Sequence, residues 1–172
     1  MSFTQTDNEL SITPRPKLKT GQSATVVVEY GGTTGRPTDI EDALYGWVTT
    51  RDGAMVVSEP DGSATWFPVN DHPTDKAAWT FAITAPDGFT AVANGVFAGS
   101  SPGPDGTTWT WEQAEPMASY LVTLLIGPYE LVAGGTSSTG VELDHVVLAE
   151  RADTLDADGW LHSGDIGEWV DV

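Results

Sequence analysis

Charged and turn-forming residues gather between positions 59 and 77, in the stretch EPDGSATWFPVNDHPTDKA. They are a carboxylate, an aromatic-proline corner, an Asp-x-Pro turn and a lysine: Glu59, Phe67, Pro68, Asp71, Pro73 and Lys76. An Asp before a proline turn can accept hydrogen bonds from the backbone amides that follow it, and a lysine can pair with a nearby carboxylate. We therefore expect Asp71, Pro73 and Lys76 to hold the loop that carries Glu59. Without further information, Glu59 is interpreted as a solvated carboxylate before a proline.

Histidine and cysteine, the usual nitrogen and sulfur ligands of metals, form no metal motif in this chain. There are three histidines and no cysteine. His72, His145 and His162 lack the i, i+4 spacing beside a Glu that a zinc-binding helix requires. A partial calcium-loop pattern at residues 154–165 lacks its first acidic ligand. We expect no metal or cofactor to be bound by the chain itself.

The stretch at residues 59–77 resembles the N-terminal β-domain of the aminopeptidase N and leukotriene hydrolase family of zinc metallopeptidases. In that family a Gln or Glu lies just upstream of an Arg/Thr-x-x-Phe-Pro-x-x-Asp-x-Pro-x-x-Lys-Ala segment. Further matches follow in the same order, AVANG at residues 91–95 and PMASYL at residues 116–121. The similarity covers roughly residues 1–150. It implies a β-sandwich, the saddle-like domain of these enzymes, here without its first strands.

The resemblance also implies a domain organisation. Residues 1–150 are expected to form the N-terminal β-domain in partial form. Residues 151–172 are expected to be a connector or the start of the catalytic domain, and a foreign origin for residues 152–172 is the alternative. The family holds its zinc in a separate helical domain with Gly-x-Met-Glu-Asn and His-Glu-x-x-His motifs, and neither motif occurs in this chain. We therefore expect zinc to belong to the absent catalytic domain and the chain to be inactive alone.

Within this family the side chain at the position of Glu59 binds the free α-amino group of the peptide, so the resemblance implies that role for Glu59. A fixed carboxylate favours a terminal ammonium through a charge-assisted hydrogen bond, and an internal peptide nitrogen cannot supply that charge. Phe67, Pro68 and the Asp-x-Pro turn then support the site. The expected partners are a peptide N-terminus and the catalytic domain of the parent enzyme.

Composition excludes several other partners. The 172 residues carry a formal net charge of -18, from 25 acidic and 7 basic residues. Such a surface repels phosphate backbones, and no Lys/Arg cluster offsets this locally, so nucleic acid is excluded. The start MSFTQ has no basic n-region and no apolar run, so we expect neither a signal peptide nor a membrane span, and a cytoplasmic protein.

Short alternating runs rich in Val, Thr and aromatic residues predict an all-β fold. They occupy residues 23–30, 47–50, 54–58, 79–84, 107–111 and 120–126. Asp52-Gly53 between two runs predicts a tight hairpin, because both residues tolerate positive φ angles. A chain that begins within its domain would leave an open sheet edge, so self-association through edge pairing is also expected.

A second function remains open at this point. Trp109 and Trp111 lie two residues apart on a predicted strand, so they should face the same way and could form a stacking platform for sugar rings. The alternative to the aminopeptidase domain is thus a free-standing, non-catalytic β-sandwich that binds carbohydrate or protein. In that case the tryptophans would be exposed, whereas core tryptophans would be buried.

Overall fold

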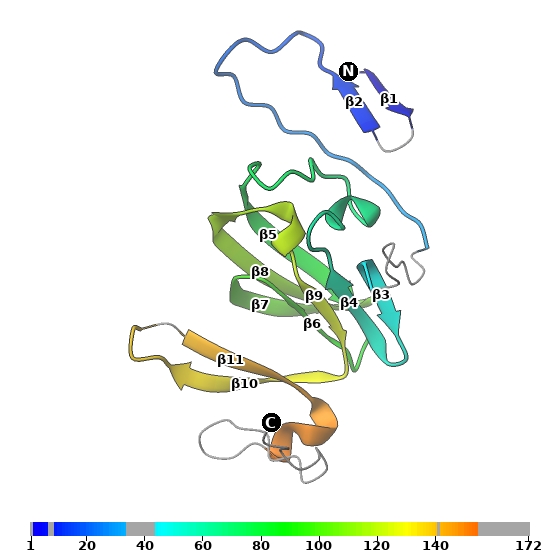
Figure 1. Cartoon of the computed structure of the whole chain (residues 1–172). Helices are drawn as coiled ribbons and strands as arrows, with labels where there is room; N and C mark the ends of the chain where they lie inside the picture. Colours follow the sequence, from blue (N-terminus) through cyan, green and yellow to red (C-terminus); the bar gives the residue numbers. More distant parts are fainter. Residues whose placement is uncertain (1, 7–8, 34–43, 141, 155–172) are drawn as a thin grey trace, which may run out of the picture. The chain divides into compact units, whose positions relative to one another are not determined.

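The computed structural model describes residues 2–6, 9–33, 44–140 and 142–154. Over these residues the chain is nearly all β-structure, which confirms the predicted fold class (Figure 1). The strands are β1 (Ser2–Thr6), β2 (Glu9–Thr13), β3 (Gly46–Thr50), β4 (Gly53–Val57), β5 (Ala77–Ala85), β6 (Thr90–Ala93), β7 (Val96–Gly103), β8 (Gly106–Met117), β9 (Leu124–Gly127), β10 (Tyr129–Thr136) and β11 (Glu142–Leu148). Three short 3₁₀ turns complete the described fold: η1 (Ser63–Thr65), η2 (Ser119–Leu121) and η3 (Ala149–Thr154).

The strands form several small sheets, as expected of a β-sandwich. Four strands pair in the order β3-β4-β9-β6 and three in the order β5-β8-β7. Two hairpins, β1-β2 and β10-β11, form two-stranded sheets of their own. Their pairing is antiparallel, as is that of β6 with β9 and of β7 with β8. Antiparallel neighbours with short connections produce the alternating pattern seen in the sequence.

The chain divides into two compact units. Unit 1 comprises Met1–Thr49, Met55–Trp79 and Gln113–Thr123, and unit 2 comprises Thr50–Ala54, Thr80–Glu112 and Leu124–Val172. The Glu59 turn lies in unit 1, and the paired tryptophans of β8 lie in unit 2. No helix in the described part of the chain has the length and apolar character that crossing a membrane would require.

The predicted hairpin joins β3 to β4, with its turn one residue earlier than expected. Arg51 and Asp52 form the turn, and Gly53 already begins β4. The glycine is required by close packing, because a Cβ atom at Gly53 would lie 1.9 Å from the carbonyl oxygen of Ile126. That distance is far inside van der Waals contact, so the position excludes every side chain.

Trp111 of β8 belongs to the core of unit 2 and Trp109 is half-buried, so the expected platform of two exposed tryptophans is wrong. Trp111 is 3% exposed, and its indole N–H donates to the carbonyl of Ala91 at 2.9 Å. Phe97 on β7 packs against both tryptophans, with ring centroids 5.8 Å from Trp109 and 5.1 Å from Trp111. A ring covered in this way has no free face for a sugar.

Two of the predicted strands differ from the structure. Residues 23–30 run without strand pairing, and all of them are exposed. The run at residues 120–126 is divided, because η2 takes its first part and β9 begins only at Leu124. The remaining predicted runs fall within β3, β4, β5 and β8. The partial calcium-loop pattern lies almost wholly outside the described residues.

Candidate functional site

Glu59 begins a tight turn directly after β4. The preceding residue, Ser58, is buried, and Glu59 itself is exposed. The peptide bond between Glu59 and Pro60 is cis, and the turn closes with a 2.6 Å hydrogen bond from the Gly62 N–H to the Ser58 carbonyl. Within the described part of the chain, no hydrogen bond or ion pair involves the Glu59 carboxylate. A free carboxylate is therefore presented at the head of a closed turn.

Side-chain contacts fix the rest of this turn. The Tyr45 hydroxyl donates to the Asp61 carboxylate, and the Thr65 hydroxyl donates to the Gly62 carbonyl at 2.6 Å. Gly62 is buried and must be glycine, because a Cβ there would lie 2.9 Å from the Ser58 Cα. The turn is thus bonded both to the residues that lead into β3 and to η1.

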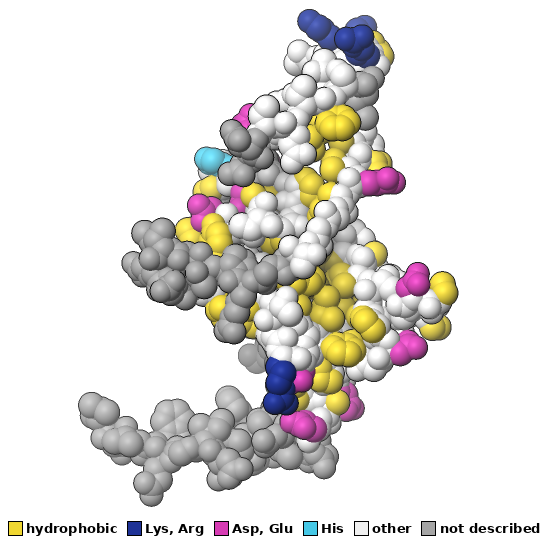
Figure 2. Space-filling view, turned by 90° about the vertical axis from the view of Figure 1, so that its right-hand side faces the viewer, with side chains coloured by type: hydrophobic (Ala, Val, Ile, Leu, Met, Phe, Trp, Pro, Cys, Tyr) yellow, Lys and Arg dark blue, Asp and Glu magenta, His cyan; other side chains and the backbone are white. Residues whose placement is uncertain are grey.

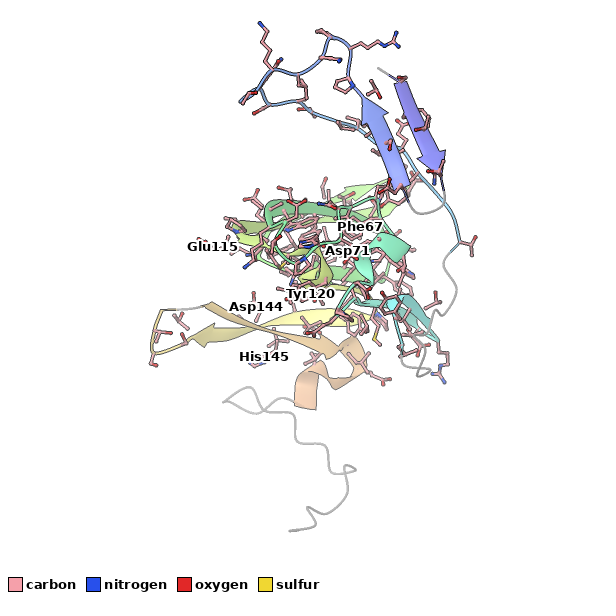
Figure 3. The ribbon with its side chains drawn as sticks, turned by 45° about the horizontal axis from the view of Figure 1, so that its top comes forward. Phe67, Asp71, Glu115, Tyr120, Asp144 and His145 are labelled. Carbon is pink, nitrogen blue, oxygen red and sulfur yellow. The ribbon has the colours of Figure 1, made fainter. Side chains whose placement is uncertain are left out.

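Asp71, which is labelled in Figure 3, is the centre of a polar network that joins this turn to a distant part of the sequence. Its carboxylate accepts the backbone N–H of Ala64 at 3.1 Å and the Ser119 hydroxyl at 2.5 Å. The Ser63 hydroxyl in turn donates to the Ser119 carbonyl at 2.8 Å. Ser63 and Ser119 are 0% and 1% exposed, so the bonds of the two serine hydroxyls are protected from competing water. We call Ser63, Asp71 and Ser119 the polar clasp.

Phe67 takes part in a row of aromatic rings in unit 1. Its centroid lies 4.5 Å from that of Trp66 and 5.8 Å from that of Trp79, both in edge-on geometry. Trp47 on β3 extends the row, 5.6 Å from Trp66. The Trp79 indole donates to the Met117 carbonyl at 3.0 Å. Tilted and edge-on aromatic pairs are favourable beyond their buried area, so the row stiffens the segment that follows the Glu59 turn.

The other predicted supporting residues lie at the surface. Pro68, Pro73 and Lys76 are exposed, and in the described chain Lys76 makes no ion pair, contrary to expectation. His72 is a turn residue whose Nδ1 accepts the Thr74 N–H at 3.3 Å. The donors to Asp71 also differ from those expected: they are an earlier amide and a distant hydroxyl, where following amides were predicted.

Two polar atoms on either side of the turn are buried without a partner among the described residues: the Ser58 hydroxyl and the Trp66 indole nitrogen. Each unpaired buried group costs about 1–3 kcal/mol. Such groups are rare in folded proteins, and each calls for an explanation.

The described residues offer no place for a metal. Nowhere among them do three His, Asp or Glu side chains gather as ligands would. The described residues therefore do not supply the three protein ligands that a catalytic zinc site requires.

Comparison with known proteins decides the family. The sequence profile of the Peptidase M1 N-terminal domain matches residues 1–121. The chain belongs to this family. The resemblance identified from residues 59–77 is thereby confirmed. Aminopeptidase N of Streptomyces lividans is 31% identical over 90 residues, which are 51% of this chain and 10% of that protein.

Solved structures of M1 enzymes resemble the fold. A variant of a two-domain M1 zinc metallopeptidase bound to L-arginine has a TM-score of 0.62 and 28% identity, over 69% of this chain and 28% of that one. The M1 zinc metallopeptidase of Deinococcus radiodurans has a TM-score of 0.57 and 28% identity, over 67% and 28%. Aminopeptidase A of Legionella pneumophila, in complex with aspartic acid, has a TM-score of 0.55 and 26% identity, over 65% and 14%. The chain thus spans a tenth of the curated relative and less than a third of these structures.

The polar clasp contains two residues that sequence reasoning missed. Ser119 lies within the PMASYL segment that matched the family, so the signal was present without an assigned role. Ser63 carried no signal, because its bond depends on a partner 56 positions away. The structure thus brings Asp71 together with Ser63 and Ser119, and leaves Pro68, Pro73 and Lys76 at the surface.

Proposed function

We propose that this chain is the non-catalytic N-terminal domain of a zinc aminopeptidase, in which Glu59 binds the free α-amino group of the substrate. The domain extends over residues 1–150, and residues 151–172 lead toward the catalytic domain. The observation that carries the proposal is the exposed Glu59 carboxylate, which has no partner among the described residues, at the head of a turn fixed on both sides. Membership of the M1 family supplies the context.

The chemistry of the ligand follows from the carboxylate. A peptide with a free N-terminus carries an ammonium group that donates to Glu59 in a charge-assisted hydrogen bond. An internal peptide nitrogen has one N–H and no charge, so it would leave the carboxylate poorly paired. Glu59 therefore selects chain ends, and the selection is independent of the side chain of the first residue.

The ligands bound by relatives support this assignment. Their structures were solved with L-arginine, aspartic acid and L-tryptophan, whose side chains are cationic, anionic and aromatic. These ligands have the α-amino and α-carboxyl groups in common. Binding of ligands with such different side chains by M1 enzymes is consistent with recognition through the amino end.

The peptide bond would be cleaved by the rest of the enzyme. Zinc held by the catalytic domain supplies an activated water when bound. The residues of this chain bind and orient the substrate. Glu59 holds its amino end, and the polar clasp keeps the Glu59 turn in place. Alone, the chain is expected to bind amino-terminal ligands weakly and to hydrolyse nothing.

The test uses the complete enzyme that carries this domain, with Glu59→Ala as the main variant, because glutamine also occurs at this position in the family. Glu112→Ala is the matched control, because Glu112 is also exposed and the chemical change is the same. Free and N-acetylated peptides are compared by their kcat/KM. We expect Glu59→Ala to reduce the preference for free peptides and Glu112→Ala to leave it unchanged. Equal preference in the parent enzyme and the Glu59 variant would overturn the assignment.

A further inference from the structure

Asp61, two residues after Glu59, joins the Glu59 turn to the residues that lead into β3. The Tyr45 hydroxyl donates a hydrogen bond to the Asp61 carboxylate across 16 positions of the sequence. Asp61 is exposed and Tyr45 is half-buried. In the described chain, Tyr45 is the one side chain that bonds to this carboxylate. The exposed part of the turn is therefore tied to a side chain that is itself packed.

The backbone beside Tyr45 also lies directly against the turn. A Cβ atom at Gly46 would lie 2.1 Å from the Thr65 hydroxyl oxygen and 3.3 Å from the Gly62 carbonyl oxygen. In the opposite direction, a Cβ atom at Gly62 would lie 3.2 Å from the Gly46 nitrogen. Gly46 has a φ of +69°, a conformation that other residues rarely adopt. The Tyr45 side chain thus starts from a backbone position that is fixed relative to the turn, so its hydroxyl can hold Asp61 in one place.

Charge alone does not distinguish Glu59 from the other carboxylates of this chain. There are 25 acidic residues, and acidic side chains lie at several separate places on the face seen in Figure 2. Asp61 is itself an exposed carboxylate, and its Cα lies within about 7 Å of that of Glu59, the greatest span of two residues. A substrate ammonium is bound at one defined place only if the carboxylate that binds it is held in a fixed geometry.

We propose that Tyr45 is a positioning residue for the binding of the substrate's amino end, an inference that rests on the proposed role of Glu59. Tyr45 acts through Asp61, whose carboxylate it holds, and thereby fixes the turn that carries Glu59. The polar clasp fixes the residues that follow the turn, whereas Tyr45 fixes the turn itself.

The test compares the kcat/KM of free and N-acetylated peptides in the complete enzyme. This ratio does not depend on how much enzyme is folded, because the same folded population cleaves both substrates. Tyr45→Phe removes only the hydroxyl, and we expect it to reduce the preference for free peptides about three- to thirtyfold. Tyr129→Phe is the matched control, because Tyr129 is also half-buried and its hydroxyl has no partner among the described residues. The control should leave the ratio within about twofold.

Two variants of Asp61 separate its hydrogen bond from its charge. Asp61→Ala removes the acceptor and should reduce the preference as much as Tyr45→Phe, with no further loss when the two are combined. Asp61→Asn removes the charge but keeps an acceptor oxygen, so it should retain most of the preference. An equal loss in Asp61→Asn and Asp61→Ala would show that the charge of Asp61 attracts the substrate, and would overturn the role of Tyr45.

The Glu59→Ala variant, measured in parallel, separates this inference from the one on which it rests. If Glu59→Ala reduces the preference and Tyr45→Phe does not, the role of Tyr45 is refuted while that of Glu59 stands. If Glu59→Ala leaves the preference unchanged, both roles are refuted. In the Glu59→Ala background, Tyr45→Phe should have no further effect on the ratio. An equal reduction in both backgrounds would mean that Tyr45 does not act through Glu59, which also refutes its role.

Discussion

Removal of the Asp71 carboxylate provides the most direct test of how the Glu59 turn is held. Asp71→Ala deprives two donors of their acceptor: the Ala64 amide and the Ser119 hydroxyl. Ser119 is 1% exposed, so its hydroxyl would remain buried without a partner. A hydrogen bond to a charged group contributes about 1.5–3 kcal/mol, and the exposed Ala64 amide can turn to water. We expect Asp71→Ala to lower the free energy of unfolding by about 2–4 kcal/mol.

A double-mutant cycle separates this bond from other effects of the substitution. Ser119→Ala removes the hydroxyl but keeps the Ser119 carbonyl, which continues to accept the Ser63 hydroxyl. In the Asp71→Ala/Ser119→Ala double variant no buried hydroxyl is deprived of its partner by the substitutions. We therefore expect its loss to be smaller than the sum of the single losses, with a coupling of about 1–3 kcal/mol.

Urea unfolding of the isolated chain, followed by tryptophan fluorescence and circular dichroism, measures these quantities. Trp66 and Trp79 lie in the same unit as Asp71, so fluorescence reports on the relevant region. The slope m should remain constant between variants, because the surface exposed on unfolding does not change. Additive losses, with a coupling below about 0.5 kcal/mol, would refute the role assigned to the polar clasp.

Other consequences can be tested independently. Gly53→Ala should cost about 1–3 kcal/mol of unfolding free energy because its Cβ would meet the Ile126 carbonyl, while Gly32→Ala, with no atom within 4 Å, should change stability by less than about 0.5 kcal/mol in the same urea experiment. After washing with chelator, the purified chain should hold no stoichiometric zinc by metal analysis and should release no product from aminoacyl arylamides; one tightly bound zinc per chain would contradict the assignment of catalysis to another domain. In the complete enzyme, Glu59→Ala should lower kcat/KM for free peptides by about 1.5–3 kcal/mol in transition-state terms, with unchanged thermal melting.

The strands rich in β-branched or aromatic residues and bounded by turn signals could be predicted from sequence, and the others could not. β3, β4, β5 and β8 have this composition, and each was expected. β7 and β10 contain glycines and lie beside bulges, where the register shifts and the period of two is lost. Residues 23–30 have the opposite property, because their pattern is that of a strand but the described chain supplies no partner.

The candidate site also contains residues that could be predicted from the sequence and residues that could not. Glu59, Phe67 and Asp71 could be found because their spacing along the sequence is fixed within one segment. The clasp could not be found, because the bonds of Ser119 join residues 48 and 56 positions apart. Spacing rules describe neighbours on one strand or turn, and they contain no information on which loops meet in space. Lys76 illustrates the converse, since an expected local ion pair does not form in the described chain.

The polar clasp also determines when the Glu59 turn can finish folding during synthesis. Asp71 leaves the ribosome 48 residues before Ser119, so the Glu59 turn emerges long before its last hydrogen bonds can close. At about 5–20 residues per second, this interval lasts about 2–10 s. During that time the turn and its neighbouring aromatic residues lack the hydrogen bonds to Ser119, and they are accessible to chaperones. The Glu59 turn is thus fixed only after β8 and η2 have been translated, and a ribosome pause within β8 would prolong the period before these hydrogen bonds form.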